Sequence, residues 1–197
     1  MSYRTKLLIS DFVQLLFGTI GLVMAVRSMG WKNFMYYTEL SNYLLMAGLI
    51  IHVIYLLKGG EMPRWVTRLK YAGVCTVAVT FVVVVTVLSW FFGLWYLLTA
   101  GVMLYHHTIC PLLAVASFLF LEKEEATRED VRWSLLPTLL YGTVMIILNI
   151  VGTVVGPYPF LMVRYQPWYM SIIWIIVIVG GAALLSMGLR KLHKGLI

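Results

Sequence analysis

The sequence predicts an all-α polytopic membrane protein, a bundle of six transmembrane helices with both termini in the cytoplasm. Three observations lead to this fold: 61% of the 197 residues are hydrophobic and only 12% are charged, the apolar residues form long runs, and the basic residues lie mostly on one side of those runs. A typical soluble domain has about 25% charged residues, and a disordered chain needs low hydrophobicity. Both of these classes are therefore excluded.

Six apolar runs are long enough to cross the hydrocarbon core of a bilayer, which takes about 20 residues in a helix. The runs lack the alternation of barrel strands, so helices are expected. We place the spans at residues 7–26, 37–57, 71–90, 97–121, 133–155 and 168–188. They leave room only for short loops, so residues 1–197 are expected to form a single six-span domain in a multi-pass integral membrane protein.

The Lys and Arg residues predict the orientation, because cytoplasmic loops carry an excess of them. Twelve of the 15 lie in the N-terminal segment, the loops after the second and fourth spans, and the C-terminal segment, and the others are Arg27, Lys32 and Arg164. This asymmetry places both termini in the cytoplasm. It also explains the formal charge of +7 without nucleic acid as a partner. The acidic cluster at 122–130 is expected to be a solvated cytoplasmic turn.

Ionisable and amide side chains inside the spans are costly and usually mark function. Near the inner side, Asp11 and His52 are expected to form a buried structural pair, with a proton relay as the alternative, and Gln14 could join them from the next turn. A second group lies in the outer half of the spans and is expected to line one cavity. It comprises Thr38, Ser41, Asn42, His106, His107 and Asn149.

The second and fourth spans carry the most informative part of this outer group. Thr38, Ser41 and Asn42 share one helix face, where helix packing is the alternative to a functional role. In the fourth span, Pro111 has no N–H, so the carbonyl of His107 loses its helical partner. Broken backbone of this kind is tolerated where it faces a polar cavity or protein and not lipid.

A hydroxyl and a histidine in an apolar cavity are the minimum parts of an acyl-transfer site. The histidine removes the hydroxyl proton, and the alkoxide attacks an ester carbonyl. Asn42, Asn149 or a Tyr hydroxyl could donate to the oxyanion. Adjacent histidines cannot readily chelate one ion from a regular helix, and no phosphate loop is present, so neither a metal nor a cofactor is expected.

The outer loop at 156–167 contains three prolines and the apolar residues Phe160, Leu161 and Met162. These apolar side chains are expected to be shielded from water. The loop is expected to fold back as a lid over the outer mouth of the cavity, where Arg164 could meet a lipid headgroup. An ordinary interfacial loop is the alternative.

Three short motifs resemble the androgen-induced protein family and its bacterial six-span relatives. They are Tyr-Thr-Glu-Leu-Ser-Asn at 37–42, His-Thr-Ile-Cys-Pro at 107–111 and Tyr-Pro-Phe-Leu at 158–161. The order and the positions of the motifs along the six spans carry the resemblance over nearly the whole chain. The similarity to bacterial members implies a bacterial plasma membrane protein.

Animal members of that family are threonine hydrolases of fatty acid esters of hydroxy fatty acids and use one Thr and one His. The resemblance therefore implies Thr38 as the nucleophile and His107 as the general base. In animal members the proline falls one residue further on, and that spacing selects His106. A more distant resemblance to YwaF-type membrane proteins, some of which are acyltransferases with a cysteine nucleophile, implies Cys110 in that role.

Three functions thus remain open. The first is an intramembrane hydrolase that acts on a lipid or fatty-acyl ester. The second is a non-enzymatic membrane protein that binds or transports a hydrophobic ligand or protons through the same polar residues. The third is a cysteine-dependent acyltransferase. Composition and spacing alone favour neither of the first two functions over the other. The family resemblance favours the hydrolase.

Overall fold

The computed structural model describes all 197 residues and is built from helices, without strands. Five helices are long and apolar enough to cross a membrane. They are α1 (Tyr3–Met29) with its 3₁₀ extension η1 (Gly30–Met35), α2 (Tyr37–Lys58), α3 (Arg64–Val83) with the π-helical η2 (Val84–Leu88) and α4 (Ser89–Phe92), α7 (Arg128–Ile150) and α8 (Trp168–Leu196). The all-α fold and five of the long apolar helices expected from the sequence are confirmed.

The segment expected to span at 97–121 differs from the other five. It is divided into α5 (Leu94–Thr99), a turn, the π-helical η3 (Leu104–Ile109) and α6 (Cys110–Phe120). The turn contains Gly101 at φ +52°, a left-handed conformation that glycine adopts without steric cost. The remaining apolar helix, Leu104–Phe120, is about 25 Å long at 1.5 Å per residue, shorter than a full crossing.

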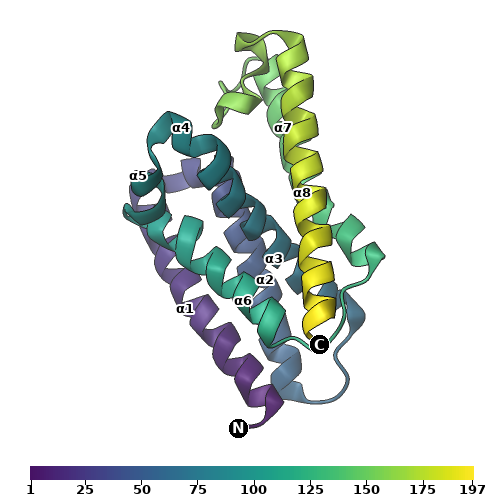
Figure 1. The fold of residues 1–197 in the computed structure, drawn as a ribbon. Helices are drawn as coiled ribbons and strands as arrows, with labels where there is room; N and C mark the ends of the chain where they lie inside the picture. The colour runs from purple at the N-terminus through teal and green to yellow at the C-terminus, as the bar shows by residue number, and fades with distance from the viewer.

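The two termini lie at the same end of the bundle (Figure 1). We call this the terminal end, and we call the opposite end, with α4, α5 and the loop between α7 and α8, the far end. Helix α3 contacts α2, α6, α7 and α8, so it is the central element. Helices α7 and α8 form a hairpin beside the others and extend furthest at the far end (Figure 1).

Helices α2 and α3 approach each other closely because glycine occupies the contact. A Cβ atom on Gly73 would lie 2.7 Å from the Cα of Leu45, and one on Gly48 would lie 3.3 Å from the Cα of Lys70. Small residues commonly allow this close backbone approach between membrane helices. Leu45 and Leu49 of α2 pack beside the contact in the main hydrophobic core.

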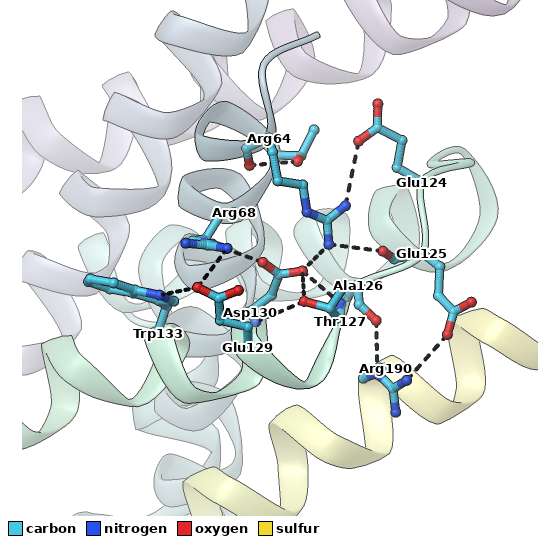
Figure 2. Close-up of polar contacts among 11 residues, drawn as sticks. Arg64, Arg68, Glu124, Glu125, Ala126, Thr127, Glu129, Asp130, Trp133 and Arg190 are labelled. Atoms are coloured by element: carbon cyan, nitrogen blue, oxygen red, sulfur yellow. Dashed lines mark hydrogen bonds and ion pairs between the residues drawn. The ribbon is translucent and has the colours of Figure 1, made fainter.

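The acidic cluster at 122–130 forms the expected solvated turn only in part, because Glu124 and Glu129 are exposed but Asp130 is not. Asp130 is 1% exposed, accepts a hydrogen bond from Arg68 Nε at 3.0 Å and pairs with Arg64. It also caps α7 together with Thr127. Arg190 of α8 donates to the Ala126 carbonyl at 2.8 Å. Figure 2 shows these contacts joining the ends of α3, α7 and α8, so the cluster holds three helices together.

The α2–α3 contact yields a stability prediction. Gly73→Ala should lower the free energy of unfolding by about 1–3 kcal/mol, because the new methyl group meets backbone atoms that cannot move away. Gly188→Ala is the matched control, since a Cβ there would have open space around it. Thermal unfolding of the purified protein in detergent measures both. Equal melting temperatures for Gly73→Ala and the wild type would contradict this packing.

Candidate functional site

An apolar pocket lies between α2, the end of α3, η2, α7, α8 and the loop after α7. Fifteen of its 20 lining residues are hydrophobic, and Leu88, Ile146, Trp174 and Ile178 are among them. An apolar lining with a few polar groups is typical of small-molecule sites. The lining therefore suits an apolar ligand, and its few polar groups can fix how such a ligand is oriented.

Thr38 lines this pocket and is 6% exposed. It is the second residue of α2, where a backbone N–H has no helical partner. That N–H donates to the Tyr158 hydroxyl at 3.3 Å, and the hydroxyl oxygens of Thr38 and Tyr158 are 3.4 Å apart. Burial raises the pKa of the Tyr158 hydroxyl to about 12, so this group remains protonated at neutral pH and can donate.

Ser41 and Asn42 hold the turn that carries Thr38, as their shared helix face predicts. Ser41 Oγ and Asn42 Nδ2 donate to the Thr38 carbonyl at 2.9 and 2.8 Å. Ser41 Oγ also lies 3.0 Å from the hydroxyl of Thr80 on α3. Asn42 Nδ2 donates in addition to the His106 carbonyl at 3.1 Å. A single amide nitrogen thus joins the start of α2 to the π-helical segment with both histidines.

His106 is fully buried, and acceptors lie near both of its ring nitrogens. Nδ1 is 2.7 Å from the Glu39 carboxylate, and Nε2 is 3.4 Å from the Gly18 carbonyl. The ring lies against α1, where a Cβ on Gly21 would be 2.3 Å from Nε2. Both ring nitrogens of His106 therefore face acceptors on α2 and α1, and neither is directed at Thr38.

His107 has a different hydrogen-bonding arrangement, although it is the next residue. Its Nδ1–H donates to the Leu97 carbonyl at 2.7 Å, so the neutral ring carries its lone pair on Nε2, as a general base requires. No hydrogen bond joins His107 to Thr38, and His107 is not among the residues that line the apolar pocket. The direct contact expected between these two side chains is therefore absent from this structure.

The other two candidates from the sequence lie away from Thr38. Asn149 is buried and shapes the outer loop: its Nδ2 donates to the Val154 carbonyl at 3.1 Å, and its Oδ1 accepts from the Arg164 amide at 3.0 Å. Cys110 is 2% exposed at the start of α6. Neither residue lines the pocket.

The outer loop folds back onto the bundle, as expected from its apolar residues. Tyr158, Phe160 and Leu161 are buried and line the pocket. The ring of Phe160 lies 5.9 Å from that of Trp174 on α8. The loop therefore forms one wall of the pocket and supplies the Tyr158 hydroxyl that contacts Thr38.

At the terminal end, the expected pair of Asp11 and His52 is formed, with Oδ2 and Nδ1 2.6 Å apart. Gln14 does not join it, because its Nε2 donates to Ser10. Lys70 joins instead, with Nζ 2.7 Å from Asp11 Oδ1. From the sequence, Lys70 was expected to be a charge in the loop after the second span. In the structure it lies within α3, which begins at Arg64.

Glu39 and Tyr158 lie near Thr38 but were not assigned to the site from the sequence. Glu39 belongs to the motif at 37–42, and Tyr158 belongs to the motif at 158–161. Acidic residues are rare inside membrane spans and need a partner there, so Glu39 could have been identified from its position alone. Its ionic partner is His106.

The Glu39–His106 pair yields a second stability prediction. Glu39→Leu should lower the free energy of unfolding by about 3–5 kcal/mol, because it leaves the buried imidazole without its counter-charge. Glu39→Leu combined with His106→Leu should recover much of that loss. Glu61→Leu, at an exposed position, is the control. Denaturation in detergent measures these proteins together with the single variant His106→Leu, and strictly additive losses in the double variant would argue against a coupled pair.

Comparison with known proteins gives no further guide to the site. No protein family, curated protein or solved structure matches this chain. The positions of Thr38 and Tyr158 in the lining of the apolar pocket, and the hydrogen bonds of His106 and His107 outside it, are therefore the basis for assigning a function.

Proposed function

We propose that the chain crosses the membrane six times, with Leu104–Phe120 as a shortened fourth crossing and both termini in the cytoplasm. The five long apolar helices support this, and the shared position of the termini fits an even number of crossings (Figure 1). Twelve of the 15 basic residues mark the terminal end as cytoplasmic. The resemblance to bacterial relatives suggests the plasma membrane of a bacterium.

This topology can be tested with reporter fusions. A reporter inserted at Gly60 should lie in the cytoplasm, and one inserted at Gly156 should lie outside, because these turns are at opposite ends of the bundle. Alkaline phosphatase and fluorescent-protein activities read the two sides. Both insertions reporting the same side would refute the six-crossing arrangement.

Within that topology, we propose that the protein is an intramembrane threonine hydrolase of lipid esters. The observation that carries this proposal is the position of Thr38, which lines a pocket with a mostly hydrophobic lining, as an acyl chain requires. The resemblance to fatty acid ester hydrolases points to the same residue. The substrate class is a fatty-acyl ester, taken from the surrounding membrane lipids.

The chemistry assigns one task to each side chain. His107 Nε2 accepts the proton of the Thr38 hydroxyl, and Thr38 Oγ1 attacks the ester carbonyl. The protonated hydroxyl of Tyr158 donates to the oxyanion. The alcohol leaves with the proton from His107, and water then releases the fatty acid by the same steps. Because catalytic hydrogen bonds often tighten only with substrate, we infer that Thr38 and His107 come together when the pocket is occupied.

His107 is preferred over His106 as the base because the two rings differ in their hydrogen bonds. His106 has acceptors at both nitrogens, whereas His107 donates only through Nδ1. Cys110 is a weaker candidate for the nucleophile, since it is buried and lies off the pocket.

One observation favours a second function, the binding or transport of a hydrophobic ligand. No histidine lines the pocket, and the Thr38 hydroxyl is paired with that of Tyr158. A binding protein needs only the apolar lining and a few polar groups to orient its ligand. In that case the pocket would retain a lipid without turning it over.

Hydrolysis of a chromogenic long-chain acyl ester by purified protein tests the enzymatic proposal. Thr38→Ala should abolish turnover, and His107→Ala should reduce it by about 10²–10⁴, because Thr is a weak nucleophile without a base. Rates should be compared per folded molecule, with melting temperature as the check on folding. His106→Ala should lower stability more than the rate.

Cys110→Ser serves as the control and should keep most of the activity. Activity that survives Thr38→Ala but is lost in Cys110→Ser would favour the acyltransferase. No turnover by the wild type, together with a lipid that copurifies in the pocket, would favour the binding protein.

A further inference from the structure

One glycine of α7 lies on the side of that helix that faces the apolar pocket. Thr138, Gly142 and Ile146 all line the pocket, and they share one face of α7 because residues four apart on a helix lie above one another. Thr138 and Ile146 fill their part of this face with side chains. Gly142 leaves a gap between them.

Close helix packing does not explain this glycine. At Gly21, Gly48 and Gly73 a Cβ atom would lie 3.3 Å or less from an atom of another helix, so these glycines allow helices to approach each other. A Cβ on Gly142 would meet no side chain and no neighbouring helix within 4 Å. Gly181 of α8 has equally open surroundings, but it is exposed and does not line the pocket. The space beside Gly142 therefore belongs to the pocket.

The gap lies next to the polar end of the pocket. The hydroxyl of Tyr37, the residue before Thr38, is 2.7 Å from Thr138 Oγ1, one turn of α7 before Gly142. The residue on the other side, Tyr141, has its ring centroid 6.5 Å from that of Tyr158, whose hydroxyl contacts Thr38. A chain that extends from Thr38 along α7 therefore meets the gap first.

The pocket also reaches the surface that faces lipid. Ile175 of α8 lines the pocket and is 46% exposed. Helix α8 has its main contacts with α3, α6 and α7, whereas η2 has its main contacts with α3, α4 and α5. Thus η2 and α8 face each other across the pocket without packing closely, and a hydrocarbon chain can enter from the membrane between them.

We propose that the acyl chain of the ligand passes over Gly142, and that this glycine determines how long a chain the pocket accepts. The inference rests on an acyl chain in the pocket, which the hydrolase and the binding protein proposed above have in common. A larger side chain at this position would occupy the gap and exclude a long chain. A short acyl group at Thr38 would be affected less, because it extends less far along α7.

Photocrosslinking of the full-length protein in phosphatidylcholine nanodiscs tests this inference. The probe is palmitic acid with a diazirine at the middle of the chain, and mass spectrometry maps the labelled residues. Residues of the pocket such as Ile146 and Ile178 should be labelled in the wild type. Gly142→Leu should reduce this labelling about tenfold or more, because room for two methylene groups is lost.

Two controls separate the pocket from the lipid-facing surface. Gly181→Leu adds the same side chain outside the pocket and should leave the labelling of the pocket unchanged. Leu184, which is 70% exposed and does not line the pocket, should be labelled equally in all variants. Gly142→Ala is the smaller change and should cause a smaller loss, with melting temperature as the check on folding. Equal labelling of the pocket in wild type and Gly142→Leu, or a wild-type pocket that is not labelled, would overturn the inference.

Ester hydrolysis distinguishes this inference from the proposed activity. Gly142→Leu should lower the turnover of a palmitoyl ester more than that of a butyryl ester, whereas Thr38→Ala should abolish both. Equal losses for the two esters in Gly142→Leu would contradict a role in chain length. Labelling that depends on Gly142 in a protein without esterase activity would support the inference and refute only the hydrolase.

Discussion

The structure depends on one constraint: an ionisable side chain between apolar helices must find its partner on another helix. Asp11, His52 and Lys70 meet this need at the terminal end and connect α1, α2 and α3. Glu39 and His106 meet it nearer the far end and connect α2 to the π-helical segment before α6. In a medium without water each such pair is far costlier to break than to keep. The two groups therefore fix the relative positions of α1, α2, α3 and the π-helical segment, and α2 and α3 form one side of the pocket.

Much of the fold follows from residue types and lengths alone. Apolar runs of about 20 residues leave no alternative to helices, and Asp11 and His52 were predicted to pair because both lie near the same side of the membrane. The interruption before η3 was not predicted, since it arises from a left-handed turn at Gly101 inside an otherwise apolar stretch. Lys70 and Asp130 were expected to be solvated charges, because the sequence does not show that the beginnings of α3 and α7 pack against other helices.

The candidate site, like the fold, could be predicted only in part. The shared face of Thr38, Ser41 and Asn42 was predictable from helical spacing. The different roles of His106 and His107 could not be predicted, because they depend on the groups that surround each ring. His106 lies beside a carboxylate and a backbone carbonyl, whereas His107 lies beside a single carbonyl. Both histidines lie in the π-helical segment, where Asn42 Nδ2 donates to the His106 carbonyl. Glu39 pairs with the ring of His106, whereas the ring of His107 donates through Nδ1 to the Leu97 carbonyl.

The central claim is that Thr38 is a nucleophile at the polar end of an acyl-chain pocket. Labelling of the purified protein with a fluorophosphonate probe, followed by mass spectrometry of the modified peptide, tests it most directly. The account predicts a covalent adduct on Thr38 that is lost in His107→Ala and suppressed by a long-chain ester. An adduct on Cys110, or no adduct on a folded protein that retains a lipid in the pocket, would contradict it.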